Sequence, residues 1–218
     1  MEIIPLGDSA LLVRTQDRAV PDLLQCLSAA MIPGLVELVP ASSSIGVFYD
    51  SAQTAFEEVR QQLQVVLSSG ASAEQRKPGR MTDIPVCYDA AFAIDLAEVA
   101  RHTGLTPAEV VQRHSGANYF VSCVGFTPGF PYLSGMPVAL ATPRRATPRK
   151  EVPAGSVAIG GAQTGIYPQV SPGGWNVIGR TPLRLFNLAQ DPPALLRAGD
   201  RVRFRAITRA EFDAASSR

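Results

Sequence analysis

Residues 125–184 read GFTPGFPYLSGMPVALATPRRATPRKEVPAGSVAIGGAQTGIYPQVSPGGWNVIGRTPLR, and this stretch decides the fold of the second half of the chain. Of the 18 glycines in the sequence, 11 lie between Gly116 and Gly179, and 9 of the 18 prolines lie between Pro128 and Pro182. Glycine and proline mark turns, and helical periodicity is absent here. Many short strands joined by turn-rich loops predict a β-barrel or β-sandwich, with β-prone runs at 119–124, 156–159, 176–178, 183–186 and 201–206.

The sequence before this stretch predicts a small α+β domain followed by a linker. Short β-rich runs and helical stripes alternate in the order β-α-β-β-α, at 11–13, 21–31, 35–39, 45–49 and 56–66. Residues 68–80 are rich in Ser, Gly, Ala and charge and lack periodicity, so we interpret them as the linker. We therefore assign residues 1–80 to an N-terminal α+β domain with its linker, and residues 81–210 to the barrel domain.

Two short helices are expected near the start of the barrel domain, over residues 95–103 and 107–114. Asp95 and Thr106 each stand three residues before a glutamate, which is the spacing of a capping box. Gly104 between the two segments is a suitable end for the first helix. We expect both Asp95 and Thr106 to cap their helices.

The composition is that of a globular protein with no excess of positive charge. Hydrophobic residues make up 46% and charged residues 18%, and the net charge is +1, which argues against a nucleic-acid partner. No apolar run approaches the roughly 18 residues of a membrane span, and we see no signal peptide. Cys26, Cys87 and Cys123 fit neither a zinc pattern nor a disulfide framework. We expect a cytoplasmic protein without a metal site.

Large aromatic side chains stand on turn-forming segments of the barrel domain. Phe126, Phe130 and Tyr132 belong to the run GFTPGFPYL, and Trp175, the one tryptophan, ends the run SPGGW. The three rings of the first run either plug one end of the barrel or line a binding pocket. Trp175 is either a packing anchor or a pocket wall or interface residue.

A cationic loop, residues 142–150, reads TPRRATPRK and holds four basic side chains within seven residues. Its two prolines reduce the entropy lost when the loop presents its side chains. Guanidinium groups suit the bidentate binding of carboxylate or phosphate. Arg144, Arg145 and Arg149 are therefore candidate anion-binding residues, and the alternative is a solvated charged face.

Residues 160–168, GGAQTGIYP, combine paired glycines with neutral polar side chains. Gln163, Thr164 and Tyr167 offer donors and acceptors that suit the edge of an amide or lactam. The alternative is a tight barrel corner with a β-bulge, where glycine is equally useful.

His114 is the better of the two histidines as a candidate for proton transfer. Its predicted helix ends just before Gly116, so we expect the ring to face the barrel mouth; the alternative is a surface or helix-capping histidine. The sequence contains no GxxxxGK[ST] phosphate loop, no GxGxxG, no HExxH and no GxSxG. These features together predict ligand contact without independent catalysis.

The motifs in combination resemble the family of bacterial 5-oxoprolinase B subunits, also labelled allophanate hydrolase subunit 1 or the KipI-type inhibitor of a sporulation histidine kinase. The resemblance runs from about Ile3 to Ile207. It is carried by the motifs GDSALLV (7–13), HTGL (102–105), HS (114–115), GFTPGFPYL (125–133), TPRRATPR (142–149), VPAGSV (152–157), GAQTGIYP (161–168) and SPGGW (171–175).

The resemblance implies a fold, a reaction and partners. The fold is a small N-terminal α+β domain followed by a C-terminal cyclophilin-like β-barrel. The reaction is the ATP-dependent hydrolysis of 5-oxo-L-proline, a lactam, to L-glutamate, carried out with the A and C subunits of 5-oxoprolinase by a chain that is inactive alone. ATP is expected on one of those partners or at a shared interface. The alternatives are a chain that binds and inhibits a sensor histidine kinase, and an allophanate- or urea-processing protein.

The same resemblance gives the candidate residues their expected roles. His114 would move protons. The arginines at 144, 145 and 149 would bind the substrate carboxylate or a phosphorylated intermediate. Gln163, Thr164 and Tyr167 would hold the amide edge. Phe126, Phe130, Tyr132 and Trp175 would form a pocket or an interface.

Overall fold

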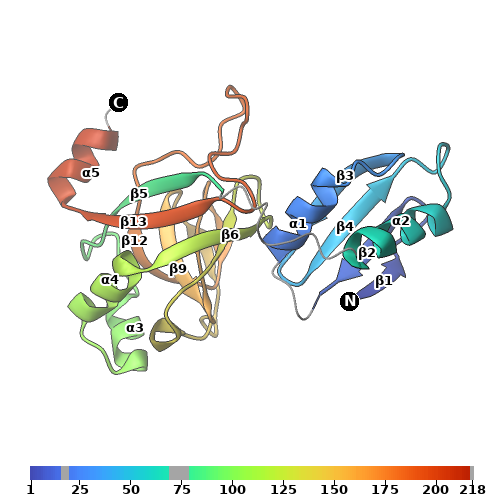
Figure 1. Cartoon of the computed structure of the whole chain (residues 1–218). Coiled ribbons are helices and arrows are strands. Elements are labelled where there is room, and N and C mark those ends of the chain that lie inside the picture. Colours follow the sequence, from blue (N-terminus) through green and yellow to red (C-terminus); the bar gives the residue numbers. More distant parts are fainter. Residues whose placement is uncertain (16–19, 69–78, 217–218) are drawn as a thin grey trace. The chain divides into compact units, whose positions relative to one another are not determined.

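The computed structural model describes residues 1–15, 20–68 and 79–216, and the chain divides into two compact units, Met1–Pro78 and Gly79–Arg218 (Figure 1). The predicted linker at 68–80 lies almost wholly outside the described residues. The second unit extends past residue 210, the expected end of the barrel domain, because a further helix follows the last strand. No helix in the described ranges is both long and apolar enough to span a bilayer.

The first unit packs two helices on an antiparallel sheet of order β1-β2-β4-β3. Its elements are β1 (Glu2–Pro5), β2 (Ala10–Arg14), α1 (Val20–Ala29), β3 (Leu35–Pro40), β4 (Ser44–Tyr49) and α2 (Phe56–Ser68). Leu11 and Val13 of β2 lie two residues apart and enter the same core as Leu23 of α1 and Leu63 of α2. The apolar faces of the strands and of the helices therefore pack together in one core, as expected from the alternation in the strands and the apolar stripes of the helices. The short edge strand β1 was not predicted.

The second unit is built on a closed seven-stranded barrel of order β10-β7-β6-β13-β5-β12-β9. All barrel pairs are antiparallel except β13 with β5. The elements of this unit are β5 (Met81–Cys87), α3 (Leu96–Thr103), α4 (Pro107–Gly116), β6 (Asn118–Val124), β7 (Pro131–Ser134), a 3-10 helix (Val138–Leu140), β8 (Arg149–Val152), β9 (Ser156–Gly160), β10 (Gln163–Ile166), β11 (Ser171–Gly173), β12 (Asn176–Arg180), β13 (Arg201–Ile207) and α5 (Arg209–Ser216). The predicted α+β class with a C-terminal β-barrel is confirmed.

Two features of the barrel unit differ from the expectation. The run 183–186 forms no strand and contributes a single bridge, between Phe186 and Ala194. Conversely, the segment whose glycines and prolines were interpreted as turns contains four strands that were not predicted, β7, β8, β10 and β11. These strands are three or four residues long, so their alternation is too brief to stand out among the turn signals.

Strand alternation divides the barrel side chains between two separate clusters. Leu133, Ile159, Ile166 and Ile178 belong to the main barrel core. Their immediate neighbours Tyr132, Ala158, Tyr167 and Val177 belong to a second, smaller cluster together with Phe130 and Trp175. Because successive side chains of a strand point to opposite faces, the second cluster lies on the outer face of the barrel wall. The aromatic side chains therefore do not plug the barrel end.

Of the two predicted helix caps, the one at α4 is confirmed and the one at α3 is not. Thr106 forms the predicted capping box at α4, where its hydroxyl accepts from the Glu109 amide and the Glu109 carboxylate accepts from the Thr106 amide. Asp95 occupies the N-cap position of α3, but its side chain makes no capping bond, so that prediction is wrong. Its carboxylate is engaged by arginines instead, as described below.

Candidate functional site

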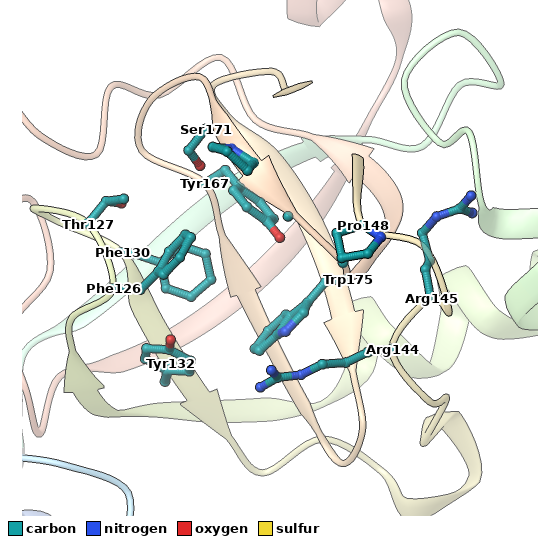
Figure 2. A pocket seen from close by; sticks show the side chains of 13 residues that line it. Phe126, Thr127, Phe130, Tyr132, Arg144, Arg145, Pro148, Tyr167, Ser171 and Trp175 are labelled. Carbon is teal, nitrogen blue, oxygen red and sulfur yellow. The ribbon is translucent and has the colours of Figure 1, made fainter. Parts of the chain in front are cut away.

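The outer aromatic cluster forms the wall of a cavity of about 510 Å³, which we call the aromatic pocket (Figure 2). The rings of Tyr132, Tyr167 and Trp175 surround Phe130, with centroids 4.9, 5.2 and 5.7 Å from it. Most of these contacts are edge to face, which is a favourable arrangement of aromatic quadrupoles. Phe126 packs edge-on against Phe130 and stands at the rim with 63% of its surface exposed. The rings predicted to form a pocket are thus brought together in one.

Glycines of the glycine- and proline-rich segment make room for these rings. A Cβ at Gly160 would lie 2.5 Å from three atoms of the Trp175 indole. A Cβ at Gly173 would lie 2.2 Å from the Tyr167 hydroxyl. These positions need glycine because the ring occupies the space of a side chain, not because of the backbone angle. The glycine content of the segment is therefore part of how the pocket is built.

Replacing Gly160 with alanine is expected to destabilise the protein by about 1–3 kcal/mol, because the indole must move to admit the methyl group. Urea unfolding measures the loss, and near-UV circular dichroism reports the displaced tryptophan. Gly125→Ala is the matched control, since a Cβ there meets nothing within 4 Å. It should change stability by less than about 0.5 kcal/mol. Equal effects of the two substitutions would contradict this account of the pocket wall.

The polar groups around the aromatic pocket come from its rim and wall. The Arg144 guanidinium lies over the Trp175 ring, 5.7 Å from its centroid, which is within the range of a cation–π contact. Burial raises the pKa of the Tyr132 and Tyr167 phenols, so both remain neutral hydrogen-bonding groups at neutral pH. The pocket therefore offers a space with aromatic walls and one exposed cation at its edge.

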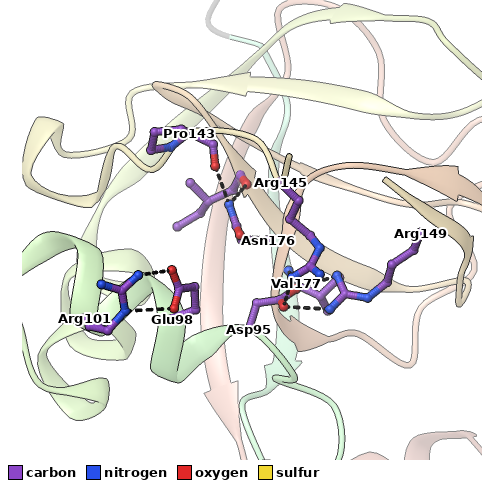
Figure 3. A network of polar contacts seen from close by, with 9 residues as sticks. Asp95, Glu98, Arg101, Pro143, Arg145, Arg149, Asn176 and Val177 are labelled. Atoms are coloured by element: carbon purple, nitrogen blue, oxygen red, sulfur yellow. Dashed lines mark hydrogen bonds and ion pairs between the residues drawn. The ribbon is translucent and has the colours of Figure 1, made fainter. Parts of the chain in front are cut away.

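The cationic loop is held in place by one buried carboxylate (Figure 3). Asp95, with 4% of its surface exposed, accepts from Arg145 at 2.9 Å and from Arg149 through two bonds of 2.8 and 2.7 Å. It also accepts from the Val177 amide at 2.7 Å, and its own amide donates to the Val177 carbonyl. Asp95 thus joins the start of α3, the cationic loop and β12.

This network changes the roles expected for the three arginines. Arg145 and Arg149 were predicted to bind a substrate anion, but their guanidiniums are paired with Asp95, so we correct this interpretation to a structural one. Arg145 still lines the aromatic pocket, whereas Arg149 does not. Arg144 is exposed, lines the pocket and has its guanidinium over Trp175. Of the predicted arginines, it is the one placed to meet a ligand.

His114 lies inside the barrel unit and is fully buried, so it does not face the barrel mouth as expected. Its ring stacks on Phe204 with centroids 4.5 Å apart. Tyr88 Oη lies 2.8 Å from Nδ1, and Thr164 Oγ1 lies 3.0 Å from Nε2. Burial lowers the His114 pKa from 6.5 to about 3, so the imidazole is neutral at neutral pH.

The hydrogen-bond partners of His114 fix its tautomer. Thr164 donates its one hydroxyl hydrogen to the Ala158 carbonyl, at 2.9 Å, so it accepts from His114. Nε2 therefore carries the hydrogen, and Nδ1 accepts from the Tyr88 hydroxyl. Every polar atom of the ring is satisfied within the core, and the arrangement leaves no lone pair directed at a ligand.

Strand alternation separates Thr164 from the other two residues predicted to hold an amide edge. Thr164 points inward to His114, Gln163 precedes it on β10, and Tyr167 follows the strand and packs in the aromatic cluster. Gln163 is not among the residues that line the aromatic pocket, whereas Tyr167 is. The structure therefore brings Tyr167 to the pocket and places Gln163 and Thr164 elsewhere.

Of the pocket residues that were not predicted as site residues, two carry hydroxyl groups. Thr127 and Ser171 both line the aromatic pocket, and Ser171 is 8% exposed. Ser171 belongs to the run SPGGW, and Thr127 to GFTPGFPYL, so both lie inside motifs that the sequence does single out. Small hydroxyl residues beside proline and glycine are typical of turns, and for this reason they did not stand out.

The barrel, its outer pocket and the α+β unit that precedes it in the chain define a recognised class of domain. A family model described as the carboxyltransferase domain, subdomains C and D, matches residues 1–196. Within that class, the chain is 40% identical to the 5-oxoprolinase B subunit of Bacillus subtilis (strain 168), covering 98% of this chain and 95% of that protein. It is 47% identical to the 5-oxoprolinase B subunit of Escherichia coli O157:H7, covering 79% and 78%. The chain belongs to the family of 5-oxoprolinase B subunits.

Solved structures show the same fold. The conserved uncharacterized protein PH0987 from Pyrococcus horikoshii is 42% identical, with a TM-score of 0.60 over 97% of this chain and all of that one. The K. lactis urea amidolyase gives a TM-score of 0.77 at 18% identity, covering 97% of this chain and 15% of that one. At this low identity the second likeness concerns the fold alone.

Proposed function

We propose that the chain is the B subunit of an ATP-dependent 5-oxoprolinase and contributes the aromatic pocket to the site at which 5-oxo-L-proline is hydrolysed to L-glutamate. The observation that carries this proposal is the pocket itself, with aromatic walls and the Arg144 guanidinium at its edge. A five-membered lactam offers a flat apolar ring to such walls and a carboxylate to the cation. The names of the relatives point to the same reaction.

The composition of the pocket supports a shared site. Opening a lactam requires an activated carbonyl oxygen and stabilisation of the negative charge that develops on it. The described lining of the pocket has one exposed guanidinium and no carboxylate, cysteine or histidine. The sequence contains no phosphate loop. We therefore place ATP and the activating groups on partner subunits of the A and C types or at an interface with them, and expect the chain to be inactive alone.

The proposal is tested by mixing the purified chain with the A and C subunits and measuring glutamate release from 5-oxo-L-proline with and without ATP. Release should require ATP and all three proteins. Parallel reactions with allophanate and urea, and a histidine kinase autophosphorylation assay, test the other candidate activities. Absence of glutamate in every mixture would refute the proposal, and inhibition of the kinase in its place would assign the chain a regulatory role.

Replacing Arg144 with alanine is expected to raise the KM for 5-oxo-L-proline by roughly 10- to 100-fold, because a hydrogen-bonded ion pair with the substrate carboxylate is lost. The kcat should fall much less, since the carboxylate does not react. Lys150→Ala is the matched control, because Lys150 is an exposed cation of the same loop and does not line the pocket. A similar rise in KM for both variants would show a general charge effect and not a binding site.

A further inference from the structure

Unpaired buried polar atoms gather at the aromatic pocket. Within the described ranges, three buried side-chain nitrogen or oxygen atoms have no hydrogen-bond partner: Thr127 Oγ1, Arg145 Nε and Ser171 Oγ. All three residues line the aromatic pocket. A buried polar atom without a partner destabilises a fold, so native structures keep few of them. Arg145 is already paired with Asp95, so the two hydroxyls are the groups at this cavity that a ligand would complete.

The Ser171 hydroxyl is set at this position by an irregularity in the strand pairing. Ser171 begins β11, which pairs with β8, and the register shifts between Ser171 and Gly173. Such irregularities redirect side chains and are common beside binding sites. A serine or threonine hydroxyl is both a donor and an acceptor, and it reorients by rotation about one or two bonds. It can therefore meet either the carbonyl or the N–H of an amide.

The hydroxyls and the cation lie at different ends of the pocket. Figure 2 shows Ser171 above the Tyr167 ring, Thr127 beyond Phe126 and Phe130, and Arg144 below the Trp175 ring. A lactam acid such as 5-oxoproline has the same division, because its amide edge and its carboxylate leave the ring in different directions. The aromatic rings between them match the apolar faces of the ligand.

We infer that the hydroxyls of Ser171 and Thr127 bind the amide edge of a cyclic amide in the aromatic pocket, while Arg144 binds its carboxylate. The inference rests on the proposed function for the identity of the ligand. The sequence predicted that Gln163 and Thr164 hold the amide edge, and the inference assigns this role to Ser171 and Thr127 instead. Both hydroxyls act as positioning and specificity groups, because they distinguish a lactam from a ring without the amide.

Trp175 provides the readout, because it is the one tryptophan of the chain and forms the pocket wall. Its fluorescence is titrated with 5-oxo-L-proline and with cyclopentanecarboxylate, which keeps the ring and the carboxylate but lacks the amide, using the full chain alone and in the complex with its partners. Ser171→Ala and Thr127→Val should each weaken binding of the lactam roughly 10-fold. Neither should change the binding of cyclopentanecarboxylate. Ser115→Ala, whose hydroxyl bonds to the Val111 carbonyl, is the control.

Stability separates a ligand-binding hydroxyl from a structural one. Ser171→Ala removes an unpaired buried oxygen, so its urea midpoint should equal or exceed that of the original protein while lactam binding weakens. A fall in stability together with unchanged lactam binding, or an equal loss for both ligands, would overturn the inference. The inference is also overturned if no cyclic amide changes the fluorescence of Trp175, either in the chain alone or in the complex.

Failure of the proposed function gives a different result. If the complex hydrolyses 5-oxo-L-proline equally well with Ser and with Ala at position 171, the hydroxyl assignment fails and the proposed function stands. If 5-oxo-L-proline is neither bound nor hydrolysed, but succinimide or hydantoin binds in a manner that depends on Ser171, the proposed substrate fails. The assignment of the hydroxyls to an amide edge then stands.

Discussion

Replacing Asp95 with alanine is expected to lower the free energy of unfolding by about 3–5 kcal/mol, because a buried carboxylate is removed from two arginines. The side chain accepts hydrogen bonds from Arg145, Arg149 and the Val177 amide, all at 2.9 Å or less. Without it the two guanidiniums, which are 33% and 24% exposed, lose their counter-ion, and the amide loses its acceptor. Urea unfolding at pH 7 measures the change.

The chain offers a matched control for this substitution. Asp83 forms the same type of paired contact with Arg203, through two bonds of 2.9 Å, but the side chains are 48% and 58% exposed. Water screens and competes with an exposed ion pair, so Asp83→Ala should cost about 1 kcal/mol or less. A loss at position 95 no larger than that at position 83 would show that the carboxylate does not hold the cationic loop.

The second large effect is a loss of stability in acid that originates at His114. The unfolded chain takes up a proton at this histidine as the pH falls through about 6.5, whereas the folded chain does so only near 3. The unfolded state therefore binds more protons between these values, and the folded state loses stability as the pH falls. Linkage gives a loss of about 1 kcal/mol between pH 7.5 and 5.5, rising to about 5 kcal/mol below pH 3.

Urea unfolding between pH 7.5 and 5.5 tests this linkage in a range where carboxylates remain ionised. His102→Asn is the control for the other histidine of the chain, which is exposed. Nitrogen NMR of the folded protein should show His114 as the neutral tautomer with hydrogen on Nε2 throughout the range. A protonation midpoint of His114 near 6.5 in the folded protein would contradict the buried hydrogen-bond chain.

Local sequence signals predicted much of the fold. The Thr106 capping box, the stop at Gly104 and the helical stripes act within four residues, so they are present in the sequence itself. Runs of β-prone residues predicted the long strands β6 and β13, and β13 also shows a readable alternation of charged and apolar residues. The strands of three or four residues were hidden among glycines and prolines.

The sequence predicted which segments form the candidate site, but not the role of each residue in them. The aromatic motifs did meet in one pocket, and Arg144 stands at its edge. By contrast, the sequence does not show that Asp95 pairs with Arg149, 54 positions away, or that His114 bonds to Thr164, 50 positions away. Because of these contacts, Arg145 and Arg149, predicted to bind the substrate, and His114, predicted to be catalytic, have their partners inside the fold.

The sequence by itself determined the family, the order of most elements and the segment that builds the pocket, because motifs, caps and periodicity are properties of neighbouring residues. Tertiary structure decided which polar groups are satisfied and which are left for a ligand. Barrel closure directs Thr164 inward to His114, and the separate pairing of β11 with β8 places Ser171 at the outer pocket. Burial then sets the cost of every unpaired atom, and burial is known only once the chain has folded.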